Sequence, residues 1–225
     1  IPHYNAGRGV SQAVIDYILA MDSVGIDVAC RNVSLTGANA EVPQRILELE
    51  QKSISDAEVC IQHLLPHHLV GSDKFKKNIA LFVSETSSIK MNPWFVHLEQ
   101  MDEVWVPSEH LWNSMSQDNI NAVVKVVPHA FEMSKYKKKY PQMLNQQTDS
   151  TFKFYYIGDL NQRKNIESIL RCFHSEFDVS EPVSLILKVN KFGHDPQQVH
   201  QVIDGISQKI KHELRMYDDV RMYKQ

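Results

Sequence analysis

The stretch Phe152-Lys-Phe-Tyr-Tyr-Ile-Gly-Asp-Leu-Asn-Gln-Arg-Lys-Asn165 decides how the second half of the chain folds. Its first six residues are rich in aromatic side chains, which favours a strand that stops at a tight turn on Gly158. A one-faced helix is predicted next, because apolar residues recur at helical spacing at Ile166, Ile169, Leu170, Phe173 and Phe177.

Two cations, Arg163 and Lys164, stand at the start of this predicted helix. Backbone N–H groups and the helix dipole attract anions there, and the two side chains add positive charge. Without an anion, the cations would oppose the dipole at a cost of about 0.3–1 kcal/mol. A diphosphate-binding turn is therefore favoured over the alternative of a solvated helix start.

The same alternation of strands and helices extends along the whole chain. Helices are expected over residues 10–21, closed by Gly25, and over 43–52, 93–101, 108–115, 166–177 and from Asp195-Pro196 onward. Strands are expected over residues 26–33, 58–64, 78–83, 103–106, 123–127, 152–157, 183–189 and 220–223. The fold class is therefore α/β, with parallel sheets covered by helices on both faces.

Two Rossmann-like domains are expected, because the pattern dissolves between residues 128 and 151 and then restarts. The first domain, residues 1–150, should lack its first strand, which we expect just upstream of Ile1. The second, residues 151–225, should be incomplete, because three strands do not finish such a domain. The chain is thus expected to be truncated at both ends.

Composition narrows the class of function. A formal net charge of −3 does not favour a nucleic-acid binder. Cys30, Cys60 and Cys172 are odd in number and form no C-x-x-C pair, which is typical of free thiols in a reducing, cytoplasmic compartment. No apolar run is long enough to span a membrane. The basic residues 135–139 favour a solvated linker, with weak association to a membrane surface as the alternative.

Four motifs in this order resemble retaining glycosyltransferases of family 4. They are Glu85 followed by Trp94, the run Met101-Asp-Glu-Val-Trp-Val-Pro-Ser108, the run Val126-Val-Pro-His129, and Gly158 with Arg163-Lys-Asn165. The resemblance covers about residues 7–189. It implies the GT-B fold, in which two Rossmann-like domains face a cleft.

The resemblance also implies a reaction. Such enzymes move a sugar from a nucleotide diphosphate sugar to an acceptor hydroxyl, with retention of configuration and no required metal ion. By this resemblance, Gly158, Arg163 and Lys164 bind the donor diphosphate, and the acceptor is a carbohydrate or a lipid-linked carbohydrate. Asp159 departs from the arginine that many members carry after the glycine, and the family's paired glutamates would fall beyond residue 225.

The acceptor is expected to bind to the first domain, in the loops that follow its strands. His63 could orient a hydroxyl or take its proton, and Glu85 could bind acceptor hydroxyls. Gly7, Arg8 and Gly9 form a candidate cleft loop, and His129 follows the strand 123–127. Each of these residues has a structural alternative. His63 could be a surface or capping histidine, and Glu85 could be a carboxylate at the start of a helix. Residues 7–9 could form a simple tight turn, and His129 could contact backbone only.

Two other functions compete with this one. A non-catalytic binding or assembly module of the same fold is kept open by Asp159 and by the unfinished second domain. Another nucleotide-dependent α/β enzyme ranks lower, because Gln12 interrupts the G-x-G-x-x-G pattern that begins at Gly7.

Overall fold

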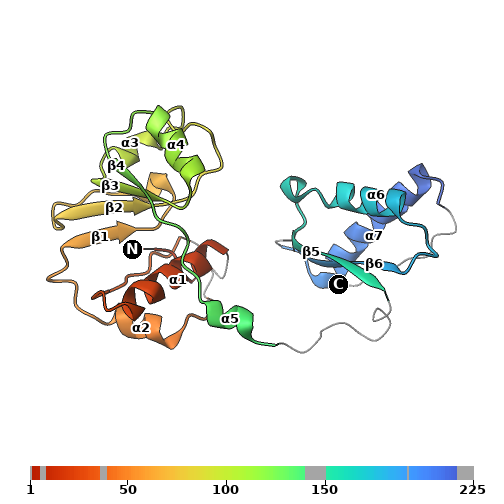
Figure 1. Ribbon diagram of the computed structural model, residues 1–225, viewed down its shortest axis with the longest axis horizontal. Coiled ribbons are helices and arrows are strands. Elements are labelled where there is room, and N and C mark those ends of the chain that lie inside the picture. Colours follow the sequence, from red (N-terminus) through yellow and green to blue (C-terminus); the bar gives the residue numbers. More distant parts are fainter. Residues whose placement is uncertain (1, 6–8, 36–39, 140–150, 192, 217–225) are drawn as a thin grey trace. The chain divides into compact units, whose positions relative to one another are not determined.

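A computed structural model describes residues 2–5, 9–35, 40–139, 151–191 and 193–216. The chain divides into two compact units, Ile1–Lys138 and Lys139–Gln225 (Figure 1). Both are mixed α/β with parallel sheets, as the sequence predicts. Residues 140–150 lie outside the described residues, so the domain boundary near residue 150 stays a prediction.

The first unit contains a four-stranded parallel sheet in the order β1-β2-β3-β4. Its strands are β1 (Val59–Gln62), β2 (Lys77–Leu81), β3 (Glu103–Val106) and β4 (Val123–Val126). Its helices are α1 (Gly9–Ser23), α2 (Gln44–Glu50), α3 (Phe95–Leu98), α4 (Glu109–Gln117) and α5 (Met133–Lys137), with a 3-10 turn η1 (Pro66–His68).

The predicted helix limits of the first unit are largely confirmed by their caps. Gly25 has φ of +84°, and the N–H groups of Gly25 and Ile26 donate to Asp22 and Met21, which closes α1. The Ser108 hydroxyl accepts from the Leu111 N–H at the start of α4. Helix α3 is much shorter than the predicted 93–101.

The predicted strand 26–33 is wrong, because these residues form no ladder with a strand in the described structure. Two of their backbone N–H groups bond to other segments: the Cys30 N–H donates to the Leu49 carbonyl and the Val33 N–H donates to the Pro2 carbonyl. Pro2 in turn forms an isolated parallel bridge with His63, just past the end of β1. Pro2 therefore lies between residue 33 and the sheet.

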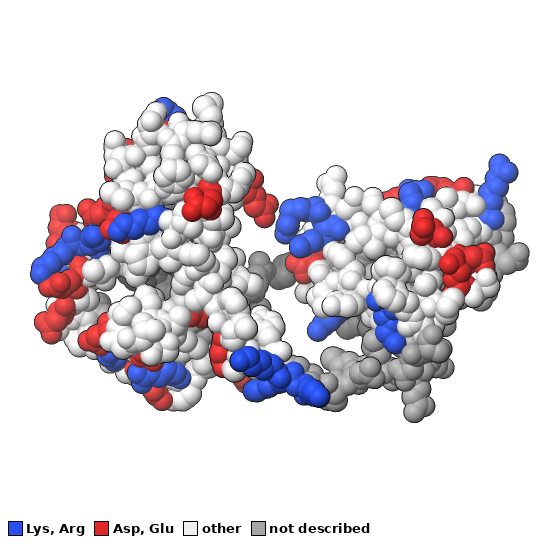
Figure 2. Space-filling model, viewed as in Figure 1, with Lys and Arg blue, Asp and Glu red and all other residues white. Residues whose placement is uncertain are grey.

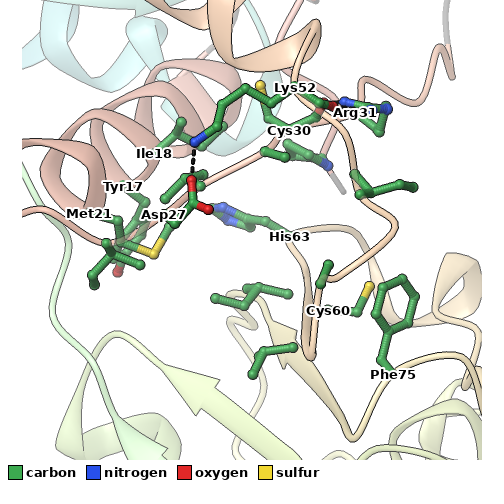
Figure 3. A pocket seen from close by; sticks show the side chains of 18 of the residues that line it. Tyr17, Ile18, Met21, Asp27, Cys30, Arg31, Lys52, Cys60, His63 and Phe75 are labelled. Carbon is green, nitrogen blue, oxygen red and sulfur yellow. Dashed lines mark hydrogen bonds and ion pairs between the residues drawn. The ribbon is translucent and has the colours of Figure 1, made fainter.

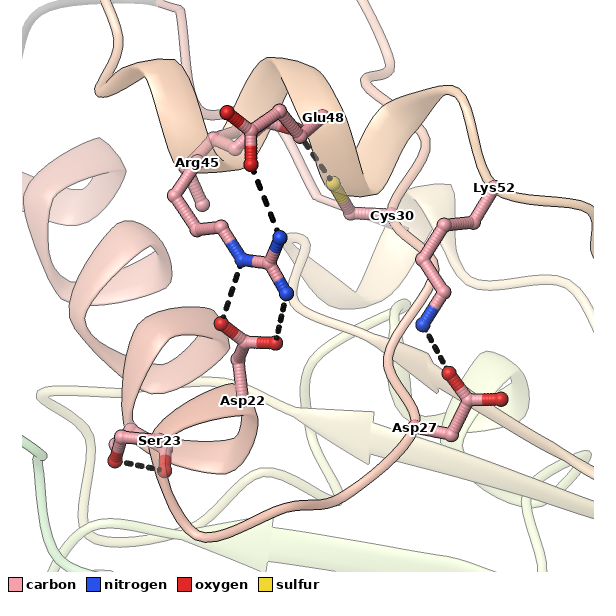
Figure 4. A network of polar contacts seen from close by, with 9 residues as sticks. Asp22, Ser23, Asp27, Cys30, Arg45, Glu48 and Lys52 are labelled. Atoms are coloured by element: carbon pink, nitrogen blue, oxygen red, sulfur yellow. Dashed lines mark hydrogen bonds and ion pairs between the residues drawn. The ribbon is translucent and has the colours of Figure 1, made fainter.

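Two apolar cores stabilise this unit. One lies between the sheet and α4 and includes Phe82, Leu98 and Met115. The other joins α1 to α2 through Val14, Ile18, Ile46 and Leu49, among others. Arg45 reinforces the α1–α2 contact with a bidentate ion pair to Asp22, at 2.8 Å for both bonds, and a 3.0 Å bond to Glu48 (Figure 4).

The second unit contains two parallel strands, β5 (Phe152–Asp159) and β6 (Val183–Asn190), with α6 (Ile166–Glu176), α7 (Pro196–Glu213) and a 3-10 turn η3 (Gln162–Lys164). The predicted start of α7 is confirmed by a capping box between Asp195 and Gln198. The expected stop at Gly158 is wrong, because β5 continues through Gly158 to Asp159. The predicted strand 220–223 lies outside the described residues.

Charged side chains of both signs are interspersed on the visible face of each unit (Figure 2). A basic group lies over α5, where Lys135 and Lys137 stand in the last turn. Lys135 pairs with Asp16 at 3.3 Å and with Glu132 at 3.7 Å, so part of this charge is neutralised within the unit. Among the described helices, none combines the length and apolar character that a bilayer crossing requires.

Candidate functional site

The cationic loop, residues 158–165, connects β5 to α6 in the second unit. Two asparagines cap its successive turns: the Asn161 side chain accepts from the Lys164 N–H at 3.0 Å, and the Asn165 side chain accepts from the Ser168 N–H at 3.4 Å. Asn165 has φ of +47°, a left-handed conformation that asparagine tolerates better than most residues. The caps hold Arg163 and Lys164 at the carboxyl end of β5, with both side chains exposed.

Gly158 is required by close packing within the strand and not by a turn. A Cβ atom on Gly158 would lie 2.7 Å from the Tyr156 hydroxyl oxygen and 3.0 Å from the ring carbon that carries it. The Tyr156 hydroxyl is buried and has no hydrogen-bond partner in the described part of the chain. Burial and the charge of Asp159 raise the pKa of Tyr156, and Arg163 lowers it by less, so the hydroxyl is a neutral donor at pH 7.

Replacing Gly158 by alanine tests this contact. We expect Gly158→Ala to destabilise the second unit by about 1–3 kcal/mol, because the new methyl group overlaps the Tyr156 hydroxyl. Tyr156→Phe removes that oxygen, so in a double-mutant cycle part of the cost should disappear. Urea unfolding followed by circular dichroism gives the four free energies, and strict additivity would contradict the contact.

A small cavity of about 330 Å³ adjoins the cationic loop. Its walls come from the loop at Asn161 and Asn165, from the first turn of α6, and from Val202 and Ile206 on α7. The loop therefore borders a space with the two asparagine caps on one side and two apolar side chains of α7 on the other.

Three aromatic rings meet in the first unit at the carboxyl ends of two strands. The Tyr17 ring on α1 lies 5.8 Å from the ring of His63, which follows β1, and 5.7 Å from the ring of His129, which follows β4. The Tyr17 hydroxyl donates to the Val127 carbonyl at 2.9 Å. The structure thus brings two predicted site residues to one tyrosine that the sequence analysis did not select. We name this set the Tyr17 cluster.

His63 is 8% exposed, and its Nδ1 atom is buried without a hydrogen-bond partner among the described residues. Burial and the nearby His129 lower its pKa to about 4. The ring is therefore neutral at pH 7. It can donate or accept a hydrogen bond, but a base of such low pKa is poorly matched to proton abstraction near neutrality.

An NMR titration of His63 should give a pKa near 4, against about 6.5 for an unperturbed histidine. In the unfolded chain His63 binds a proton more readily than in the folded chain. The free energy of unfolding should therefore decrease as pH falls from about 6.5 to about 4. In His63→Asn this share of the pH dependence should vanish. A measured pKa near 6.5 would show that the ring is not buried as described.

The other predicted acceptor-side residues are more dispersed. Glu85 is exposed in the loop after β2, and Gly9 is the first residue of α1. Gly7 and Arg8 lie outside the described residues. The loop that carries Glu85 is anchored at residues 88–90, where the Asp118 carboxylate accepts from the Ser88 hydroxyl at 2.8 Å, the Lys90 N–H at 2.9 Å and the Ile89 N–H.

The described residues contain no cluster of three or more His, Cys, Asp or Glu side chains that could hold a metal ion. No protein-family model matches the sequence, and no curated protein matches it either.

Proposed function

We propose that the chain belongs to a glycosyltransferase of the GT-B type, which transfers a sugar from a nucleotide diphosphate sugar to an acceptor hydroxyl with retention. The observation that carries the proposal is the cationic loop. Two asparagine caps fix Arg163 and Lys164 at the carboxyl end of a parallel strand, immediately before α6. Such strand ends are where α/β sheets bind ligands.

Charge neutralisation is the chemical task of this loop. As the glycosidic bond to the diphosphate breaks, negative charge grows on the leaving phosphate oxygens. Arg163 and Lys164 would stabilise that charge through charge-assisted hydrogen bonds, with no metal ion needed. The Tyr156 hydroxyl is a further neutral donor close to the same strand end.

The Tyr17 cluster is the proposed acceptor side. Neutral His63 would orient a carbohydrate or lipid-linked hydroxyl through a ring nitrogen, and Glu85 would contact further hydroxyls from the next loop. His129 would hold the Tyr17 ring in place. In this proposal the protein works in the cytoplasm, with α5 as a weak contact to an anionic membrane surface.

Titration with UDP, GDP and ADP tests the donor site directly. We expect one of these nucleotides to bind the chain, and Lys164→Ala or Arg163→Ala to weaken binding about 10- to 100-fold. A hydrogen bond to a charged group contributes about 1.5–3 kcal/mol, which sets this range. Lys153→Ala is the matched control, because it removes a lysine from the opposite end of β5. Absence of binding, or equal loss in the control, would refute the donor-site assignment.

A non-catalytic binding module is the second candidate, and Asp159 favours it. This carboxylate stands at the end of β5, where its charge works against an anionic ligand. A module would bind the nucleotide without turning over the sugar donor. Hydrolysis of UDP-, GDP- and ADP-sugars by a chain that binds the matching nucleotide separates the two candidates.

A further inference from the structure

Two histidines that follow β1, His63 and His67, each keep a buried Nδ1 atom without a hydrogen-bond partner among the described residues. Their surroundings differ. His63 lines a cavity of about 760 Å³ together with Tyr17 and Met21, next to the proposed acceptor side (Figure 3). His67 is not among the residues that line this cavity. Since a buried nitrogen without a partner carries a free-energy cost, His67 needs an explanation of its own.

The His67 ring contacts two other rings. Its centroid lies 3.9 Å from that of His68, its neighbour in the 3-10 turn η1, and 4.7 Å from that of Trp94, the residue directly before α3. The interplanar angles are 46° and 40°, so the rings are partly stacked. We name His67, His68 and Trp94 the His67 stack.

The His67 stack joins two segments of the first unit. The turn η1 follows β1, whereas Trp94 ends the loop from β2 that carries Glu85. Turn η1 and helix α3 lie against each other, and Leu69 and Leu98 anchor both segments in the same core. His67 and Trp94 are only half-buried. The stack therefore lies at the edge of this contact, where a ring can reach water.

The charges that act on His67 all have one sign. Burial is the largest cause that lowers the pKa of His67, and the positive charges of His68 and of His97 on α3 lower it further. The ring is therefore neutral at pH 7. A proton on His67 would face two other imidazoles that can also carry charge.

The carboxylates near α3 do not compensate such a proton. Glu85 and Lys90, on the loop before α3, are exposed and do not contribute to the change in the pKa of His67. Glu99, at the end of α3, accepts from the Asn121 N–H at 3.1 Å. Among the described residues, no carboxylate therefore stabilises a charged His67 ring.

We propose that the His67 stack is an acid-sensitive clasp between η1 and α3. At pH 7 the neutral His67 ring packs against Trp94 and joins the two segments. As the pH falls below about 6.5, the ring takes up a proton that the stack cannot stabilise, so it moves out to water. Trp94 is then uncovered, and the rings no longer join η1 to the loop that carries Glu85. The clasp does not depend on the function proposed for His63 or Glu85.

Fluorine NMR of protein that carries 5-fluorotryptophan tests the clasp, because the chain has only three tryptophans, Trp94, Trp105 and Trp112. We expect the Trp94 signal to move between pH 7.5 and pH 5, with a midpoint below 6.5, because the closed stack resists the proton. Trp105 lines the cavity with His63, so Trp112 on α4 is the internal control, and its signal should stay nearly constant.

Three substitutions assign the proton to His67. His67→Phe keeps a ring against Trp94 but cannot be protonated, so the Trp94 signal should lose its pH dependence. His110→Phe is the matched control, because His110 is exposed on α4, and this variant should titrate like the wild-type chain. His97→Gln removes one of the charges that oppose the proton, so the midpoint should rise toward 6.5.

Hydrogen exchange followed by mass spectrometry measures the release of the two segments. Protection of residues 64–70 and 92–98 should fall by up to about tenfold between pH 7.5 and pH 5.5. This is the limit for one proton on a histidine whose pKa in the open state is about 6.5. His63→Asn should show the same local loss, because the other buried histidine is not part of the clasp.

Three results would overturn the proposal: a Trp94 signal that does not titrate in the wild-type chain, a titration that persists in His67→Phe, or a loss of protection that is equally large in α1 and α2. An unchanged Trp112 signal shows that His67→Phe is folded. If that signal changes, His67→Gln takes its place, since glutamine is also neutral over this range and should likewise abolish the titration.

Discussion

Replacing Leu170 by alanine is expected to destabilise the second unit by about 3–4 kcal/mol, which is a large share of the stability of a small domain. Leu170 is fully buried on α6 and packs in the core cluster of the second unit with Phe173, Leu187 and Ile203. Truncation leaves a cavity between α6, the sheet and α7, and a two-stranded sheet has little other core with which to fill it.

Hydrogen exchange followed by mass spectrometry measures this effect segment by segment. In Leu170→Ala, peptides from α6 and α7 should lose most of their protection, and the nucleotide binding that we propose for the cationic loop should fall with them. Cys172→Ala is the matched control, because Cys172 is exposed two residues further along the same helix. If the two variants lose protection equally, the core of the second unit is not where the structure places it.

Replacing Asp118 by alanine is expected to cost the first unit about 2–4 kcal/mol. Its carboxylate is the acceptor for three donors at residues 88–90, and Ile89 is 2% exposed. Without it, the buried Ile89 N–H loses its partner, at about 1–3 kcal/mol, and the part-buried Lys90 N–H and Ser88 hydroxyl lose theirs at a smaller cost. The loop after β2 that carries Glu85 should open as a result.

Urea unfolding monitored by tryptophan fluorescence measures this loss in the first unit alone. Ser88→Ala is the graded control, since it removes one donor and should cost only about 0.5–1.5 kcal/mol. An Asp118→Ala variant no less stable than Ser88→Ala would rule out the anchoring role of the carboxylate.

The pH dependence gives a second measurement on the same residue. Burial raises the pKa of Asp118, but hydrogen bonds from Ile89, Ser88 and Lys90 lower it by more, so its pKa is below 3.8 in the folded state. Its contribution is therefore present above about pH 3.8 and is lost as pH falls through the lower folded value. The stability difference between the wild-type chain and Asp118→Asn should shrink over that range.

Element order and most element limits followed from the sequence, because local signals fix them. The strand 103–106 was predicted with its observed limits, Gly25 marked the end of α1, and Asp195-Pro196 marked the start of α7. Each is set by residues within a few positions of one another: a short apolar run, a left-handed glycine, or a cap followed by proline.

The errors arose where a segment depends on distant partners. Residues 26–33 have the composition of a strand, but a strand also needs a neighbouring strand with which to pair. Instead, the N–H groups of Cys30 and Val33 donate to the carbonyls of Leu49 and Pro2. The sequence pattern predicts a turn at Gly158, because the aromatic run ends there. Its role here is to leave room for the Tyr156 hydroxyl, a contact that the sequence pattern does not reveal.

For the same reason, only part of each candidate site can be predicted from the sequence. Arg163 and Lys164 are neighbours in sequence, so their shared place before α6 was predictable. Tyr17 contacts His63 and His129 across 46 and 112 positions of chain (63 minus 17 and 129 minus 17). In the sequence, Tyr17 is simply one more residue on the apolar face of α1.

The parallel pairing in both sheets has a consequence for how this chain reaches its folded state. Directly paired residues are 18 to 31 positions apart, from Val59 with Lys77 to Phe152 with Val183. Among the described strands, no pair can therefore form through a tight hairpin, and each ladder requires the entropically costly closure of a long crossover. We expect the chain to have a high contact order and to fold more slowly than a helical bundle of equal size. During folding it should expose unpaired strand edges that are prone to aggregate.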